Sequence, residues 1–106
     1  MKLNAEDWEH RGNYSVSVLH SFSERVFVQL VHVKGMVKRH FHRKQTEVFV
    51  VIEGNGILEI GESSYSVGCG DVFLCPPETV HSVEGNLKIL VFKYNYEPDD
   101  SYWLDT

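Results

Sequence analysis

Residues 35–54 read GMVKRHFHRKQTEVFVVIEG, and the stretch within them that decides the fold is Arg39-His40-Phe41-His42. Successive side chains of a strand point to opposite faces, so an H-x-H pair places both imidazoles on one face. Glu47 follows five residues later, at the start of a strand-like segment, where its carboxylate can lie beside the two histidines on a paired strand. His81 adds a third imidazole much further along the chain.

These four residues predict a site for one divalent transition metal. The ligands are His40, His42, Glu47 and His81, a set of three nitrogens and one oxygen that suits Mn, Fe, Co, Ni, Cu or Zn. Any one of them alone is better explained as a polar residue that binds nothing. A buried cluster of all four without a metal would be costly, since each unpaired buried polar group costs about 1–3 kcal/mol.

The composition describes one ordinary globular domain over residues 1–106. Hydrophobic residues make up 42% of the chain and charged residues 24%, which is typical of a folded rather than a disordered chain. The formal net charge of −5 argues against non-specific binding of nucleic acid. No apolar run approaches the roughly 20 residues of a membrane span. The first eleven residues are polar and acidic, unlike a signal peptide, so the expected compartment is the cytoplasm.

The two cysteines, Cys69 and Cys75, form no C-x-x-C pair and have no second cluster to complete a zinc knuckle. We expect two reduced and largely buried thiols. A local disulfide and a catalytic thiol are the alternatives.

Residue periodicity predicts a chain that is nearly all strand. Turn signals, above all Glu53-Gly54-Asn55-Gly56 and Glu84-Gly85-Asn86, separate short segments rich in β-branched and aromatic residues. The expected strands cover residues 14–20, 25–33, 47–52, 57–60, 65–67, 71–75, 80–83 and 88–96. Such a pattern is typical of an antiparallel sandwich or barrel. Only residues 4–9 suggest a helical turn, and the tail, 97–106, either frays or docks its aromatic side chains on the barrel or on a second subunit.

The two motifs in this chain closely resemble those of the cupin superfamily. The first, over about residues 35–54, is carried by Gly35, His40, His42, Glu47 and Gly54. The second, over about residues 70–86, is carried by Gly70, Pro76 and His81. The chain departs from the family pattern in three places: the gap after Gly35 is four residues instead of five, Glu78 replaces a glycine, and the late asparagine is displaced to Asn86.

The resemblance implies an all-β fold, the cupin double-stranded β-helix or jelly-roll barrel, as a single domain with its site in the barrel mouth. Cupins include dioxygenases, sugar isomerases, epimerases, decarboxylases, storage proteins and sensors, so the fold does not fix the reaction. The motif region is similar to the cupin portion of type II phosphomannose isomerases, and the ending Tyr96-Glu97-Pro98-Asp99-Asp100 is similar to that of sugar-nucleotide ketoisomerase cupins.

We therefore favour a metal-dependent sugar or sugar-acid isomerase that chelates adjacent oxygens of its substrate. The general base would be a tyrosine, a glutamate or a further histidine near the mouth. The alternatives are a dioxygenase dependent on Fe(II), Cu or Ni, and a non-enzymatic cupin that binds or senses a small molecule.

Half of the ten lysines and arginines lie close to the H-x-H pair. They either form a solvated turn or attract a small anionic substrate. Lys38 and Lys44 share the strand parity of the ligands and are expected to point inward. His32 shares parity with Val28 and Leu30, and is expected either in the core or, less often, in contact with substrate. His10 and His20 are expected to be solvated.

Val48, Val50 and Ile52 form an apolar row on one face of their expected strand. Because small cupins commonly pair through outer sheet faces, the resemblance predicts a homodimer.

Overall fold

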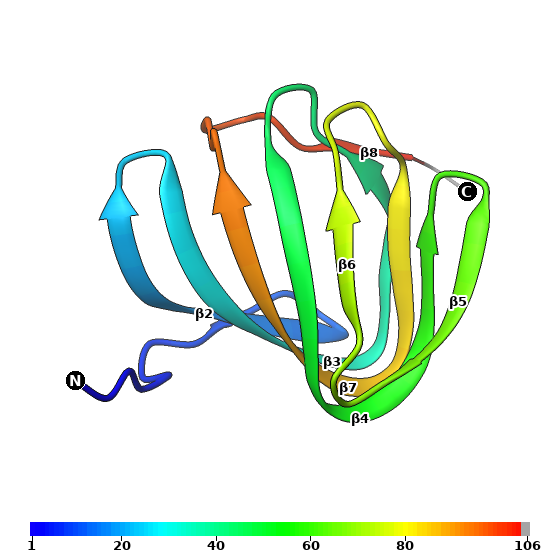
Figure 1. Cartoon of the computed structure of the whole chain (residues 1–106), viewed down its shortest axis with the longest axis horizontal. Coiled ribbons are helices and arrows are strands. Elements are labelled where there is room, and N and C mark those ends of the chain that lie inside the picture. The colour runs from blue at the N-terminus through cyan, green and yellow to red at the C-terminus, as the bar shows by residue number, and fades with distance from the viewer. Residues whose placement is uncertain (105–106) are drawn as a thin grey trace.

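The computed structural model describes residues 1–104 as an all-β domain (Figure 1), and residues 105–106 lie outside the described part. The strands are β1 (Glu9–His10), β2 (Tyr14–Ser23), β3 (Val26–Phe41), β4 (Thr46–Ile60), β5 (Ser63–Gly68), β6 (Val72–Cys75), β7 (His81–Tyr94) and β8 (Tyr102–Trp103). All pairings between them are antiparallel. No helix in the described residues could cross a membrane. The predicted all-β class is confirmed.

The architecture depends on three long strands, β3, β4 and β7. The strand order is β1-β2-β3-β7-β4-β5, with β6 also paired to β4 and β8 paired to β3. Each long strand runs through one layer, bends, and continues in the opposite layer, so that the two layers meet along the bend and separate at the other end (Figure 1). The result is a jelly-roll barrel with one closed end and one open end.

Glycines allow the long strands to approach closely where they bend. Gly85 of β7 is paired with Gly35 of β3 on one side and with Gly56 of β4 on the other. A Cβ on Gly56 would lie 2.3 Å from the carbonyl oxygen of Glu84, and one on Gly54 would lie 2.1 Å from that of Asn86. No side chain larger than hydrogen fits there without a shift of the backbone.

The two predicted turns at these glycines are therefore wrong. The residues expected to form a hairpin at 53–56 lie inside the continuous strand β4, with only a register shift between Val51 and Glu53. Residues 84–86 likewise lie inside β7. Glycine in these segments serves close packing of backbones, whereas local sequence patterns attribute it to chain reversal.

The core fills the closed end of the barrel. Val33, Val51 and Leu87 are at most 1% exposed, and each lies near the glycines of the bend. Inward positions on β7 alternate, as in Leu87, Ile89 and Val91. Towards the open end, polar side chains lie among members of this core.

A short strand near each end of the described residues pairs with the barrel. The helical turn expected over residues 4–9 does not form, because one isolated turn is marginal in water, and the segment instead contributes β1 to the sheet. The tail docks through β8, where Tyr102 pairs with Phe41 and Trp103 with His40. Of the three fates expected for the tail, docking on the barrel is the one observed.

The two cysteines are free, and they differ in burial. Cys75 is buried on β6, as expected. Cys69 is exposed, which contradicts the expectation of burial, because it lies in the turn between β5 and β6.

Candidate metal centre

Three histidines meet at the open end of the barrel. His40 lies near the end of β3, His42 directly follows that strand, and His81 begins β7 as the cross-strand partner of His40. All three are at most 9% exposed. One potential ligand atom from each lies within 4.8 Å of the other two, a spacing that suits a shared metal ion. The predicted histidine cluster is therefore present, and its three members come together.

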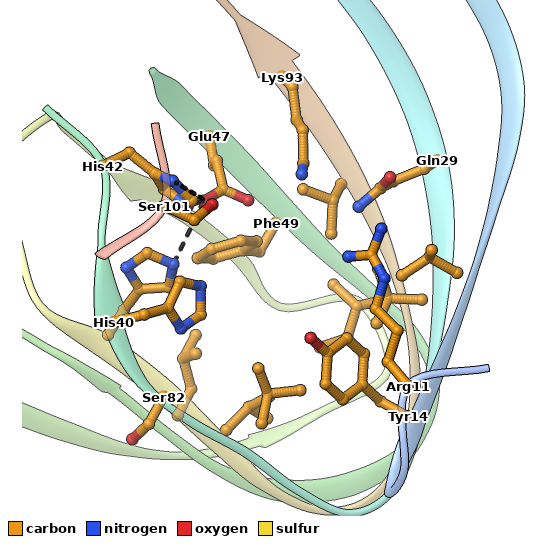
Figure 2. Close-up of a pocket in the computed structure, with 18 of the residues that line it drawn as sticks. Arg11, Tyr14, Gln29, His40, His42, Glu47, Phe49, Ser82, Lys93 and Ser101 are labelled. Carbon is orange, nitrogen blue, oxygen red and sulfur yellow. Dashed lines mark hydrogen bonds and ion pairs between the residues drawn. The ribbon is translucent and has the colours of Figure 1, made fainter. Parts of the chain in front are cut away.

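Glu47 lies beside this cluster at the start of β4. Its Oε1 atom is 2.8 Å from Nε2 of His42 and 3.2 Å from Nε2 of His81 (Figure 2). Glu47 is 5% exposed, and within residues 1–104 its Oε1 makes no hydrogen bond of good geometry. A buried carboxylate oxygen that is left this way needs a cation, either a metal ion or a protonated imidazole. That Glu47 ligates the metal stays a prediction.

The ring orientation leaves the Nε2 atoms available. Each histidine directs Nδ1 at a backbone carbonyl, to which an Nδ1–H can donate. The contacts are His40 to Lys38 at 2.7 Å, His42 to Asp100 at 3.0 Å and His81 to Thr79 at 3.0 Å. A histidine that donates from Nδ1 keeps its lone pair on Nε2, which is the usual arrangement of metal-binding histidines. The donor set thus fits a divalent transition metal.

Charge is distributed unevenly over the cluster. Burial by itself lowers the pKa of His81, but contacts with Cys75 and Glu47 raise this pKa to about 10. Burial, followed by repulsion from His81, lowers the pKa of His40 to about 4. Burial raises the pKa of Glu47, but His42 and His81 outweigh it and hold this pKa well below the usual value. In the metal-free protein, one proton on His81 therefore neutralises Glu47 at pH 7.

The segment that follows β7 holds the loop on which His42 lies. The carboxylate of Asp100 accepts hydrogen bonds from three consecutive backbone N–H groups, those of Arg43 at 3.0 Å, Lys44 at 3.1 Å and Gln45 at 3.2 Å. Burial raises the pKa of Asp100, but the three donors outweigh it and leave this pKa below its usual value. The carbonyl of the same residue accepts from His42. Asp100 thus fixes both the loop and the ring.

Two further contacts limit the freedom of the ligands. The indole of Trp103 stacks on the ring of His40, with the centroids 4.3 Å apart. The N–H of Glu78 donates to the carbonyl of His42 at 2.6 Å, and Glu78 adopts a φ of 63°. Glu78 stands where the cupin motif usually has glycine, the residue for which a left-handed backbone is least costly.

The cluster forms one wall of a cavity that opens to solvent. Together with the solvent space at its open mouth, the cavity occupies about 660 Å³. Figure 2 shows the histidines and Glu47 on one side, and Arg11, Tyr14 and Gln29 on the opposite side, with Lys93 pointing in from β7. The apolar lining consists of Val16, Val31, Val37, Phe49, Leu58, Val83, Ile89, Val91 and Trp103.

The structure contradicts the inward orientation expected for Lys38 and Lys44. Both are exposed and neither lines the cavity. A register shift between Val37 and His40 places an extra residue on β3 and resets the alternation, so Lys38 loses the parity of the ligands. Lys44 lies beyond the end of the strand, and its ammonium pairs with Glu97 at 2.9 Å.

The remaining histidines lie away from the cavity. His32 shares its face with Leu30, as expected, but this face is the outer one, because Val31 and Val33 occupy the core. His32 instead borders outer grooves, so the expectation of an inward position is wrong. His10 and His20 are exposed, as expected.

Six polar residues that line the cavity were not predicted from the sequence: Arg11, Tyr14, Gln29, Ser82, Lys93 and Ser101. Two of them could have been found by strand alternation. Lys93 follows the inward residues Ile89 and Val91 at the same spacing of two, and Gln29 precedes Val31 and Val33 in the same way. No sequence pattern pointed to Arg11 or Tyr14, since an arginine in a polar segment and a tyrosine at a strand end are common on surfaces.

The search of protein families identifies a cupin domain over residues 27–92. A curated relative, an uncharacterised protein of Methanocaldococcus jannaschii, is 28% identical over 71 residues, which are 65% of this chain and 57% of that protein. The chain thus spans little more than half the length of this relative.

Solved structures share the fold at low sequence identity. Pac13 of Streptomyces, described as a nucleoside dehydratase, superposes with a TM-score of 0.86 at 16% identity, over 98% of this chain and 90% of that one. KdgF of Halomonas sp. has a TM-score of 0.78 at 17% identity, over 89% and 90% of the two chains. A protein of Planctomyces limnophilus has a TM-score of 0.84 at 18% identity, over 97% and 94%. The family match includes both histidine motifs and most of the three long strands, and the barrel is that of these structures: the chain belongs to the cupin domain family.

Proposed function

We propose that this chain binds one divalent transition metal through His40, His42, His81 and Glu47, and that it is a metal-dependent isomerase of a sugar or sugar acid. The observation that carries the proposal is the orientation of the three imidazoles. Each is tied to a carbonyl through Nδ1, which leaves Nε2 available to a metal, and the Nε2 atoms of His42 and His81 lie within 3.2 Å of the buried Glu47 carboxylate at the wall of an open cavity.

A metal held there would act as a Lewis acid on a substrate carbonyl and would orient the adjacent hydroxyl. Three histidines and one carboxylate leave coordination positions for both oxygens. The chain's own residues would orient the rest of the substrate and exclude water, since about half of the lining residues are apolar.

Isomerisation also requires a group that moves a proton between neighbouring carbons. Tyr14 is our candidate, because it is a tyrosine whose hydroxyl faces the cavity (Figure 2) and it takes no part in the metal cluster. Among the described residues that line the cavity, Glu47 is the sole acidic one, and it is engaged by the histidines.

The fold neighbours are compatible with this chemistry. Dehydration, the reaction named for the Streptomyces protein, requires proton transfer as isomerisation does. Because these neighbours are less than 25% identical to this chain, they support the scaffold and leave the substrate open. The resemblance to type II phosphomannose isomerases, the cytoplasmic compartment and a small-molecule partner stay predictions.

The test is turnover of a panel of aldoses, uronates and sugar phosphates by metal-loaded protein, with isomers separated by chromatography and oxygen consumption recorded in parallel. We expect isomer formation without oxygen uptake. We also expect Tyr14→Phe to lose most of the turnover, by about 10²-fold or more, while its metal content is unchanged. Tyr65→Phe, on the outer surface of β5, is the matched control and should keep full activity.

Other outcomes would replace the proposal. Oxygen uptake with bound iron would establish the dioxygenase alternative. Measurable ligand binding without turnover of any panel member would establish a sensing or binding role.

A further inference from the structure

The cavity carries positive charge beside and opposite the histidine cluster, and the proposed metal chemistry does not use it. Lys93, Arg11 and Gln29 reach the cavity from parts of the chain that are far apart in sequence: β7, the connection before β2, and β3. Figure 2 shows the ammonium, guanidinium and amide groups pointing into the same space.

Among the described residues, Lys93 forms no ion pair, although Glu47, its cross-strand neighbour on β4, lines the same cavity. Within residues 1–104, no carboxylate oxygen lies within 4.0 Å of its ammonium, whereas Lys88 of the same strand pairs with Glu53 at 3.0 Å on the outer face. The rings of Phe27 and Tyr96 lie 5.7 and 6.0 Å from the ammonium, near the limit of a cation–π contact. Because Glu47 is already engaged by His81, a half-buried ammonium that forms no ion pair of its own costs free energy that a bound anion would recover.

Arg11 is oriented for the same role. Its Nε and Nη2 atoms donate to the two carboxylate oxygens of Glu9, each at 3.0 Å, which fixes the plane of the guanidinium. Nη1 takes no part in that pair, and although the Tyr14 hydroxyl lies close to the guanidinium, Nη1 carries two N–H groups, of which one can donate to a ligand. Gln29 is 7% exposed and adds an amide donor next to the two cations.

We propose that Lys93, Arg11 and Gln29 form a subsite for the anionic oxygens, carboxylate or phosphate, of the same small molecule whose hydroxyl and carbonyl oxygens reach the histidine cluster. This inference rests on the proposed function and narrows its substrate to a sugar acid or a sugar phosphate. Apolar side chains also line the cavity, among them Phe49 and Ile89, and would contact the carbon skeleton of such a ligand.

Calorimetric titration of metal-loaded protein with matched probes tests the subsite. D-Galacturonate is compared with D-galactose, and D-glucose 6-phosphate with D-glucose. We expect at least one anionic probe to bind more tightly than its neutral parent sugar. A preference in the galacturonate pair would identify a carboxylate subsite, and a preference in the glucose 6-phosphate pair would identify a phosphate subsite. Lys93→Met should lower the affinity for the anionic probe by about tenfold or more, because a charge-assisted hydrogen bond is lost. The affinity for the neutral sugars should not change.

Lys88→Met, which removes an ammonium from the outer face of the same strand, is the control and should bind as wild type. Arg11→Gln should show the same charge-selective loss and serves as a second variant if Lys93→Met does not fold. The subsite is refuted if neither anion binds more tightly than its parent, or if both variants retain wild-type affinity for the anions.

The same titrations on the metal-free protein separate this proposal from the metal proposal. A charge preference that persists there, and that Lys93→Met still removes, would support the anion subsite even if no metal binds. Loss of metal binding with the preference intact would contradict the proposed function alone.

Discussion

His81 is the residue through which pH should control metal binding. In the metal-free protein its pKa is raised to about 10, so at pH 7 its imidazole is protonated and faces Glu47. A metal ligand must be deprotonated, so metal binding at pH 7 displaces about one proton. We expect the apparent affinity for Zn²⁺ to rise with pH across the neutral range. It should fall more steeply as pH approaches 4, where His40 also becomes protonated.

Titration calorimetry in buffers of different ionisation enthalpy measures the proton release. The folding stability of the metal-free protein should change with pH in the opposite direction to the metal affinity. The folded pKa of His81 is raised, so its contribution to metal-free stability is fully present below the unfolded pKa of about 6.5. That contribution is lost as pH rises through about 10. A metal affinity that does not change between pH 6 and pH 8, about two units spanning neutrality, would contradict this account.

Asp100 is the residue that holds the H-x-H loop in place. Asp100→Asn removes the charge and one of the acceptors for the N–H groups of Arg43, Lys44 and Gln45. Outer-shell partners of metal ligands typically change metal affinity by about 10–100-fold, and we expect a loss of about tenfold, measured by competition with a chelator. Asp99→Asn, at the exposed neighbouring position, should leave the affinity unchanged. Equal affinities of the two variants would show that Asp100 has no positioning role.

At the scale of elements, the bend of the three long strands depends on the absence of side chains. In Gly56→Ala the new Cβ would lie 2.3 Å from the carbonyl oxygen of Glu84. The backbone of β7 would have to move to relieve this clash. We expect the free energy of unfolding to fall by about 1–3 kcal/mol or more, measured by urea denaturation. Gly68→Ala is the matched control, because a Cβ at that position would meet no atom within 4 Å and its φ is not positive. Similar losses in both variants would mean that crowding at the bend is not the cause.

Sequence periodicity predicted most strand positions and failed at the places where strands continue. The segments 47–52 and 57–60 form one strand, β4, as 80–83 and 88–96 largely form β7. In a local reading of the sequence, the glycines between these segments predict turns. Their real role, the close approach of Gly85 to Gly35 and Gly56, involves residues 29 to 50 positions away, which no local pattern contains.

The site was predictable to the extent that it depends on short spacing. The H-x-H pair and Glu47 follow from strand alternation, and His81 from the family motif. The alternation fails at Lys38, because the register shift after Val37 adds a residue to β3. Asp100 and Arg11 could not be foreseen, since each reaches the site through contacts that only the folded chain creates.

At the scale of the whole molecule, the outer face of β4 and β6 carries unpaired apolar side chains. Val72 and Leu74 are 61% and 60% exposed, and they are cross-strand partners of Val50 and Val48. Exposed apolar patches of this kind mark association surfaces. We therefore retain the prediction of a homodimer, with a second copy covering this face.

Leu74→Glu should convert the dimer to a monomer, because it places a charge in the apolar contact, and light scattering coupled to gel filtration measures the mass. Ile57→Glu, an equally drastic change at a 49% exposed position on the other half of β4, should leave the dimer intact. A wild-type protein with the mass of one chain would exclude the homodimer.

The central claim is that this cupin holds a metal between three histidines and a glutamate, and elemental analysis of protein purified without chelator tests it most directly. We predict about one divalent transition metal per chain in the wild type and in His20→Ala, whose histidine is exposed. His42→Ala, folded by circular dichroism, should lose most of its metal, because it lacks one of the converging ligands. A wild-type content below about a tenth of a metal per chain, or an undiminished content in His42→Ala, would contradict the account.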